Sequence, residues 1–326
     1  MENSIGVAPE LVHTLSGRGY KSFTPVQEAV LKIETIGRDA IVSAQTGSGK
    51  TVAFGLYISP ILLSHTKSTK KETLPKVLIV APTRELSLQV KTELAWLYAA
   101  TNVSIASCVG GMDILRERKS LAQKPTLIVG TPGRLKDHLE RGFLNLSAIE
   151  IVVLDEADEM LNMGFRHELE FILNKTPKAR NTIMFSATIS KGVEKLAARY
   201  QHNAVRVSTM KENSQHLDIQ YKAVLIETQD REHAIMNILR YYDTKNSLVF
   251  CATRVTVNHL TTRLHNRGFS VVALSGELNQ KERMNALRSM RDGRSKICVA
   301  TDVAARGIDL PNLDLVIHAD LPKNKE

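Results

Sequence analysis

The chain has 326 residues, of which 24% are charged and 43% are hydrophobic, and its net charge is +9. This length suits two folded domains, and this composition excludes disordered and fibrous proteins. Apolar runs such as VLIVA (77–81) are too short to cross a bilayer, and the N-terminus lacks a signal-peptide pattern. We therefore expect a cytoplasmic protein without membrane contact. The positive charge favours phosphate-rich partners, but only weakly.

Three cysteines, at positions 108, 251 and 298, lie in short apolar runs. Their spacing does not fit a metal site, and an odd number argues against a disulfide framework. We expect reduced cysteines in the core.

Short apolar runs alternate with amphipathic stretches along residues 1–207. The runs lie at 40–44, 76–81, 104–109, 126–130, 149–155 and 181–187. This alternation predicts parallel strands joined by helical crossovers, which is an α/β fold. Residues 208–218 contain no core-forming run, and we interpret them as a linker.

The alternation restarts in residues 219–326, with runs at 221–226, 247–252, 270–275, 296–301 and 313–319. We therefore predict two tandem α/β domains with mainly parallel sheets, facing each other across a cleft. In open parallel sheets ligands bind beyond the carboxyl ends of the strands, and the motifs below lie at those ends.

A glycine-rich segment, AQTGSGKT, follows the run at 40–44 and opens a helical stretch. Its glycines allow backbone N–H groups to surround phosphate oxygens, and the helix N-terminus adds positive dipole character. Lys50 can reach the β- and γ-phosphates, and the Thr51 hydroxyl can ligate Mg²⁺. The strict P-loop pattern has glycine where this chain has Ala44. The predicted nucleotide-binding residues here are Ala44, Gln45, Thr46, Gly47, Ser48, Gly49, Lys50 and Thr51.

An acidic segment, DEAD (155–158), ends the run at 149–155. Crowded carboxylates need a countercharge, which nucleotide-bound Mg²⁺ supplies. We expect Asp155 to hold the metal, partly through water, and Glu156 to orient and deprotonate the attacking water. Asp158 suits a link to neighbouring motifs better than chemistry.

Further motifs follow in a fixed order: FTPVQ (23–27) after Gly19 and Tyr20, PTREL (82–86), GG (110–111), TPGR (131–134), SAT (186–188), VFCATR (249–254), the pair Gln280 and Arg283, and TDVAARGID (301–309). Together with the two segments above they resemble the DEAD-box family of superfamily 2 RNA helicases, of bacterial type. The resemblance covers nearly the whole chain and implies two RecA-like P-loop domains.

The resemblance implies roles for individual residues. Tyr20, Gln27 and Asp309 would contact the nucleotide, with Gln27 at the adenine edge. Ser186 and Thr188 would transmit the nucleotide state, although a helix-capping role is open for both. RNA backbone contacts would come from Pro82, Thr83, Arg84, Gly110, Gly111, Thr131, Pro132, Gly133 and Arg134 in the first half, and from Arg254, Gly276 and Thr301 in the second.

One departure from the family concerns the C-terminus. Family members continue past the segment matching 316–322 into an arginine-rich motif that supplies arginine fingers, whereas this chain ends at residue 326. We therefore expect the second domain to be incomplete, and lack of such a finger costs about a thousandfold or more in rate.

Three hypotheses follow. The first is a monomeric, ATP- and Mg²⁺-dependent RNA helicase that grips the RNA backbone and locally unwinds short duplexes, with ribosomal or ribonucleoprotein substrates. The second is a truncated ATP- and RNA-binding fragment with little or no turnover. The third is a DNA-directed motor of the same superfamily.

Overall fold

The computed structural model describes residues 6–32, 37–45, 47–66, 74–209, 219–308, 310 and 312–321. The chain divides into a first unit, Met1–Asn213, and a second unit, Ser214–Glu326. Residues 210–218, most of the predicted linker, lie outside the described residues. No helix in the described ranges is both long and apolar enough to cross a membrane. All three cysteines are buried and free, as predicted.

The first unit contains one seven-stranded parallel sheet of order β3-β4-β2-β5-β6-β1-β7. Its strands are β1 (Ala40–Ser43), β2 (Val77–Val80), β3 (Ile105–Cys108), β4 (Leu127–Gly130), β5 (Ile151–Leu154), β6 (Asn181–Ser186) and β7 (Val205–Ser208). The first six match the predicted runs. The sequence prediction missed β7, which pairs with β1. Its side chains alternate between partly buried and exposed.

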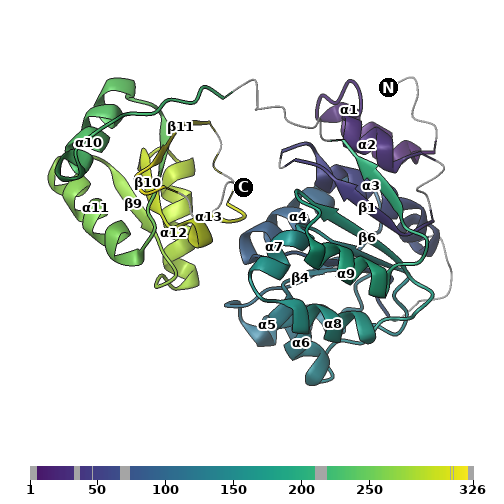
Figure 1. Cartoon of the computed structure of the whole chain (residues 1–326). Helices are drawn as coiled ribbons and strands as arrows, with labels where there is room; N and C mark the ends of the chain where they lie inside the picture. Colours follow the sequence, from purple (N-terminus) through teal and green to yellow (C-terminus); the bar gives the residue numbers. More distant parts are fainter. Residues whose placement is uncertain are drawn as a thin grey trace. The chain divides into compact units, whose positions relative to one another are not determined.

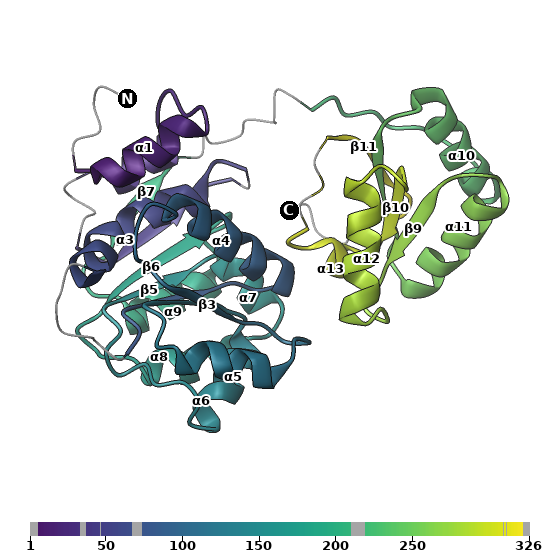
Figure 2. The ribbon, with the colours of Figure 1, turned by 180° about the vertical axis from the view of Figure 1, so that it is seen from behind.

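Helices cover both faces of this sheet (Figure 1; Figure 2 shows the reverse side). They are α1 (Pro9–Gly17), α2 (Pro25–Val30), α3 (Lys50–Thr66), α4 (Arg84–Leu97), α5 (Ile114–Ala122), α6 (Pro132–Glu140), α7 (Ala157–Asn162), α8 (Arg166–Asn174) and α9 (Lys191–Tyr200). This crossover arrangement is the expected consequence of joining parallel strands.

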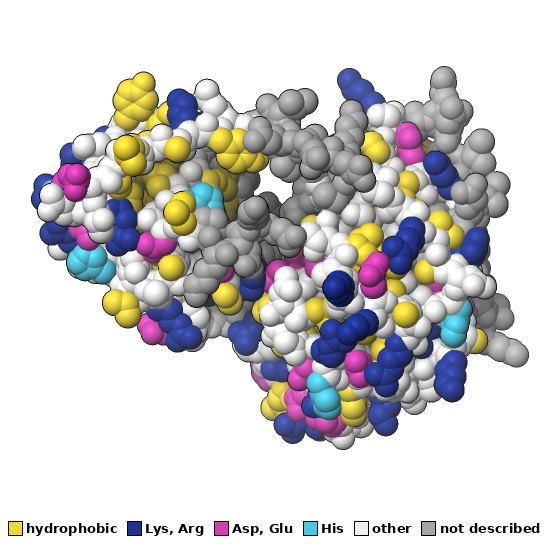
Figure 3. Space-filling model, in the orientation of Figure 1, with side chains coloured by type: hydrophobic (Ala, Val, Ile, Leu, Met, Phe, Trp, Pro, Cys, Tyr) yellow, Lys and Arg dark blue, Asp and Glu magenta, His cyan; other side chains and the backbone are white. Residues whose placement is uncertain are grey.

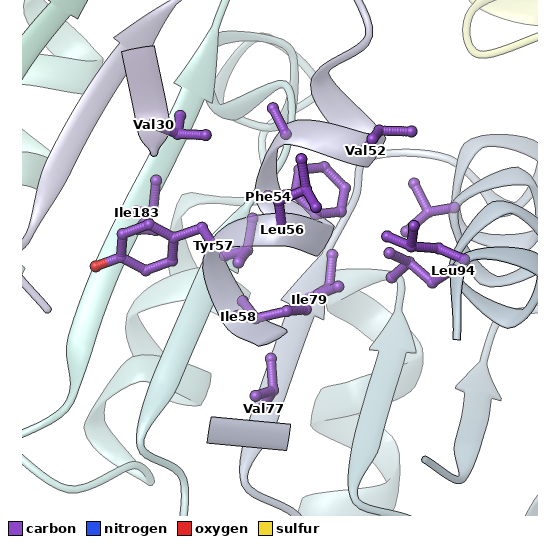
Figure 4. Close-up of a cluster of buried hydrophobic side chains, with 14 of the residues drawn as sticks. Val30, Val52, Phe54, Leu56, Tyr57, Ile58, Val77, Ile79, Leu94 and Ile183 are labelled. Carbon is purple, nitrogen blue, oxygen red and sulfur yellow. The ribbon is translucent and has the colours of Figure 1, made fainter. Parts of the chain in front are cut away.

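Alternate strand residues form two separate cores. Val77, Ile79 and Ile183 point to one face, where they pack with α1 to α4, whereas Leu78 and Met184 point to the other face, toward α5 to α9. Figure 4 shows the first core, in which side chains of α3 meet those of β2 and β6. Burial on both faces explains why these strands appear in the sequence as continuous apolar runs.

The second unit contains a four-stranded parallel sheet of order β11-β8-β10-β9. Its elements are the 3-10 helix η1 (Thr228–Asp230), α10 (Arg231–Tyr242), β8 (Asn246–Phe250), α11 (Arg254–Asn266), β9 (Val271–Leu274), α12 (Gln280–Arg291), β10 (Ile297–Ala300), α13 (Asp302–Ala305) and β11 (Leu313–His318). Both units are therefore parallel α/β units, as predicted.

One predicted strand of the second unit is wrong. Residues 221–226 contain neither helix nor strand, and Val224 and Leu225 are 60% and 101% exposed. An apolar run becomes a strand only when a neighbouring strand supplies hydrogen-bond partners, and none of the described strands pairs with this segment. Figure 3 shows apolar side chains on the surface of this unit.

Candidate functional site

Apart from Tyr20 and the segment 23–27, which precede β1, the predicted motifs of the first unit follow carboxyl ends of parallel strands, so they share one edge of the sheet. In the strand order, β3, β4 and β2 are adjacent to one another, and β5, β6 and β1 are adjacent on the other side. The first group leads into 110–111, 131–134 and 82–84, and the second into 155–158, 186–188 and 44–51. The predicted RNA motifs and nucleotide motifs therefore occupy separate halves of this edge.

The glycine-rich loop connects β1 to α3, which begins at Lys50. Gly49 has a φ of 87°, and a Cβ built there would lie 2.6 Å from Gln27 Nε2, so a larger residue would meet both strain and a close neighbour. The Ser48 hydroxyl donates to the carbonyl of Gln45 at 2.8 Å. Gly47 is exposed, and Thr46 lies outside the described residues.

Lys50 is buried at the start of α3, and Thr51 follows it half-buried. The Lys50 Nζ donates to the carbonyl of Ala44 at 3.5 Å, and the Ala44 N–H donates to the carbonyl of Ser186 at 3.2 Å. The loop thus connects to the end of β6, and the ammonium group bonds to the backbone at the start of the loop.

Asp155 directly follows β5 and is 2% exposed. Burial raises the pKa of its carboxyl group, and the nearby Lys50 ammonium opposes that rise. Its Oδ1 atom is buried and makes no hydrogen bond within the described part of the chain. A buried carboxylate oxygen without a donor is costly unless something else meets it.

The carboxyl groups of this region fit a magnesium ion that is held partly by substrate. Mg²⁺ prefers oxygen ligands and binds through one or two carboxylates, phosphates and water rather than in an all-protein cage. Asp155 Oδ1 offers such a ligand. The described residues contain no cluster of three or more His, Cys, Asp or Glu side chains that could hold a metal by themselves.

Glu156 follows in a left-handed backbone conformation, with φ 51° and ψ 54°. This conformation is uncommon outside glycine and is found at functional sites. Burial first, and then the charge of Asp155, raise the pKa of Glu156 to about 7. A carboxylate with this pKa can accept a proton near neutral pH.

Asp158 connects the acidic segment to the SAT segment. Its Oδ2 accepts hydrogen bonds from the N–H and the hydroxyl of Thr188, both at 2.8 Å. The Asp158 N–H approaches the Ser186 hydroxyl at 3.3 Å, and that hydroxyl donates to the Thr188 carbonyl at 2.6 Å. Three of these bonds join Asp158 to the SAT segment, and the fourth lies within that segment.

Gln27 lies on α2 and is fully buried. Its Oε1 accepts from the Thr24 N–H at 3.0 Å, and its Nε2 donates to the Gly49 carbonyl at 3.3 Å. Both ends of the amide therefore bond within the chain and connect α2 to the glycine-rich loop. Tyr20 stacks on Trp96 with ring centroids 6.1 Å apart.

The predicted RNA loops after β2 and β3 contact each other. Thr83 caps α4, because its hydroxyl accepts from the Leu86 N–H at 3.2 Å, and Pro82 before it is buried. The guanidinium of Arg84 lies against Gly110 and Gly111, so closely that a Cβ at either glycine would crowd it.

The loop after β4 leads into α6. Thr131 at the N-cap is buried, Pro132 is the first residue of the helix, and Gly133 after it is exposed. Arg134 turns inward, and its Nη1 lies 2.7 Å from Glu117 Oε2. The sequence prediction missed Glu117, which is 7% exposed. Its neighbours in the sequence are basic and polar, so nothing in the local pattern distinguishes it from a solvated residue.

In the second unit the predicted residues Arg254, Gly276 and Thr301 follow the carboxyl ends of β8, β9 and β10. The Arg254 side chain is 61% exposed and its Nη1 lies 3.9 Å from Glu277 Oε1, while a Cβ at Gly276 would lie 3.8 Å from Arg254 Nε. Thr301 caps α13 through the Ala304 N–H at 3.3 Å. Asp309 lies outside the described residues.

Comparison with known proteins decides the family. Residues 24–196, just over half of the chain, match the model described as DEAD/DEAH box helicase. This chain belongs to the DEAD-box helicase family. Residues 230–326 of this DEAD-box protein match the model of the helicase conserved C-terminal domain.

Curated relatives extend the match over almost the whole chain. DEAD-box ATP-dependent RNA helicase 9 of Oryza sativa is 36% identical over 325 residues, which are 99% of this DEAD-box chain and 51% of the rice protein. ATP-dependent RNA helicase CshA of Listeria monocytogenes is 36% identical over 324 residues, 99% of this chain and 61% of that protein. The chain therefore spans between half and two thirds of the length of these relatives.

Solved structures confirm the predicted RecA-like helicase fold. Dbp5 of S. cerevisiae bound to RNA and ADP BeF3 matches with a TM-score of 0.80 and 28% identity, over 99% of this chain and 81% of that one. Mss116p bound to ssRNA and AMP-PNP matches with a TM-score of 0.85 and 28% identity, over 97% and 67%.

Proposed function

We propose that this DEAD-box chain binds and hydrolyses ATP and uses the nucleotide to control its grip on RNA, so that short duplexes are locally unwound. The observation that supports this most is the division of one sheet edge into a nucleotide half and an RNA half. The two halves meet where β2 adjoins β5, and the Asp155 N–H donates to the Val80 carbonyl there at 2.9 Å.

For the nucleotide, we propose that the loop of residues 44–51 surrounds the phosphates through its backbone N–H groups. Lys50 would exchange its bond to the Ala44 carbonyl for phosphate oxygens, which carry a full charge and make stronger hydrogen bonds. Adenine recognition by Gln27 and Tyr20, and ribose contact by Asp309, stay predictions. Because Gln27 is bonded to Gly49, any movement of the loop on binding acts directly on α2.

For the metal, the proposed ligands are Thr51 and Asp155, the latter partly through water. A bound Mg²⁺ would neutralise developing charge on the phosphate oxygens. The unpartnered Oδ1 of Asp155 supports this assignment.

For hydrolysis, we propose Glu156 as the general base. It takes a proton from water as the water oxygen bonds to the γ-phosphorus and the bond to the ADP oxygen breaks. Burial holds the pKa of Glu156 at about 7, which matches a base that works near neutral pH. Lys50 stabilises negative charge on the transferred group.

For RNA, the proposed contacts are backbone contacts by the loops after β2, β3 and β4 and by the second-unit residues Arg254, Gly276 and Thr301. Such contacts carry no sequence information and weaken with salt. Asp158, Ser186 and Thr188 lie within the nucleotide half, where their hydrogen bonds join the acidic segment to the SAT segment, and we propose that Ser186 and Thr188 transmit the nucleotide state from there.

The test is the ATPase rate of the 326-residue chain without nucleic acid, with single-stranded RNA, and with DNA of the same sequence. We expect stimulation by RNA above that by DNA. An equal response to DNA would remove the RNA assignment in favour of a DNA-directed motor. Nucleotide binding without turnover would favour the fragment hypothesis, which the helicase relatives do not favour. Cytoplasmic location, a monomeric state and ribosomal substrates stay predictions.

A further inference from the structure

A buried carboxylate connects two of the proposed RNA loops. Glu117 lies on α5 and is 7% exposed. Its Oε1 accepts from the Val109 N–H at 2.8 Å, at the start of the glycine pair, and its Oε2 accepts from Arg134 Nη1 at 2.7 Å, in the first turn of α6. One side chain therefore holds both loops.

Arg134 also bonds directly to the loop after β3. Its Nη1 and Nη2 both donate to the Met112 carbonyl at 3.3 Å, directly after the glycine pair, and its side chain is only 14% exposed. The guanidinium therefore already has a carboxylate and a carbonyl as acceptors. These bonds use three of the five N–H donors of the guanidinium and aim them at Met112 and Glu117, while little of the side chain faces solvent.

His138 adds a third donor to the same carboxylate. Its Nε2 lies 2.7 Å from Glu117 Oε2, and the ring is fully buried. Its Nδ1 has no partner within the described part of the chain, which fits the tautomer that carries its proton on Nε2. A buried carboxylate that meets three donors forms a network that favours one geometry over others.

We propose that Glu117 is a positioning residue for RNA, and that Arg134 acts through it rather than as a phosphate ligand. The pair holds the glycine loop and the start of α6 at a fixed separation, so that both loops meet consecutive phosphates of one strand. This inference rests on the proposed RNA binding and replaces the direct role predicted for Arg134.

The deciding variants are Glu117→Gln and Arg134→Gln. The amide introduced by Glu117→Gln keeps an oxygen for the Val109 N–H but lacks the charge that meets Arg134 and His138. Affinity for fluorescein-labelled oligouridylate is measured by anisotropy over a series of salt concentrations, with ADP·BeF₃ and Mg²⁺ present. We expect each variant to bind RNA roughly tenfold more weakly.

Three further readouts separate positioning from other roles. The dependence of log affinity on log salt should keep its slope in Arg134→Gln, whereas loss of a direct phosphate contact on a single strand would lower the slope by about 0.7. The double variant should bind no more weakly than either single variant, because both changes break one connection. Affinity for mant-ADP should not change.

Glu140→Gln is the matched control. Glu140 lies on α6, as Arg134 does, but its side chain is 53% exposed and pairs with Lys136 at 3.8 Å. It should bind RNA as the unaltered chain does. Unchanged RNA affinity in Glu117→Gln would overturn the inference, as would equal losses of RNA and mant-ADP affinity, which would indicate a general folding role. If the unaltered chain fails to bind oligouridylate, the proposed function itself is wrong.

Discussion

The two units hold their proposed ligand-binding residues in different ways. In the first unit, side-chain hydrogen bonds connect segments that are distant in the sequence: Asp158 to Thr188, Gln27 to Gly49, and Glu117 to Arg134. In the second unit, Asp320 holds the Ala252 N–H at 2.8 Å, but the Arg254 side chain is 61% exposed. Exposed ion pairs such as that of Arg254 with Glu277 contribute little. The first unit is thus organised before ligand binds, whereas Arg254 can reorient toward an incoming phosphate.

The largest effect on activity should come from loss of the proposed general base, which lies in the first unit. Glu156→Gln removes the proposed base while keeping its size, so ATP should still bind while turnover falls by about 10²–10⁴-fold. Single-turnover ATPase assays and mant-ATP titration measure the two separately. Glu140→Gln, at an exposed glutamate, is the control and should keep its rate. A normal rate in Glu156→Gln would exclude it as the base.

Lys50 tests whether the glycine-rich loop is the nucleotide site. Lys50→Ala removes a buried ammonium group from the loop, and we expect ATP affinity to fall about a hundredfold because charge-assisted bonds to phosphate are lost. Isothermal titration calorimetry measures this. Lys195→Ala, on the exposed side of α9, should bind ATP normally. Unaltered affinity in Lys50→Ala would reject the phosphate role.

The raised pKa of Glu156 predicts a pH-dependent stability in protein free of metal and nucleotide. Its pKa of about 7 when folded exceeds the ordinary value of 4.5, so its favourable contribution to folding is present below pH 4.5 and is lost as pH rises through 7. Glu156→Gln should therefore increase the free energy of unfolding by about 2 kcal/mol near pH 8 and by much less near pH 5. Urea unfolding at both pH values measures this. An equal effect at both would contradict the assigned burial.

The smallest effect should come from the second unit. Arg254→Gln should weaken oligouridylate binding by about three- to tenfold and lower the salt slope by about 0.7, because one phosphate contact is lost. Nucleotide affinity should stay unchanged. Arg267→Gln, which follows the other end of α11, is the control. If RNA affinity falls but the dependence of log affinity on log salt keeps its slope, Arg254 positions other groups instead of contacting phosphate.

Much of the fold was predictable because most strands of the first sheet are buried on both faces. Runs such as those of β2 and β5 stand out for that reason. The strand β7 was missed because its side chains are half-exposed at a sheet edge. Residues 221–226 misled the prediction because an apolar run does not reveal whether a pairing strand is present.

The sequence suggests the nucleotide half of the candidate site because chemistry restricts its residue types: glycines for phosphate approach, lysine for charge and carboxylates for metal. The structure brings these segments to one edge of the sheet, and their ligand-binding roles stay predictions. The connecting residues were not predictable from the sequence. Glu117 becomes important only when α5 packs beside α6, and Gln27 gains its bond to Gly49 only through folding. Such contacts join positions 17 and 22 residues apart, and no local pattern marks them.

The most direct test is whether nucleotide and RNA bind cooperatively to the 326-residue chain. Affinity for labelled oligouridylate is measured with and without ADP·BeF₃ and Mg²⁺, and affinity for the nucleotide analogue with and without RNA. The account predicts that each ligand tightens the other by the same factor, on the order of tenfold or more. An RNA affinity that does not depend on the nucleotide would contradict it.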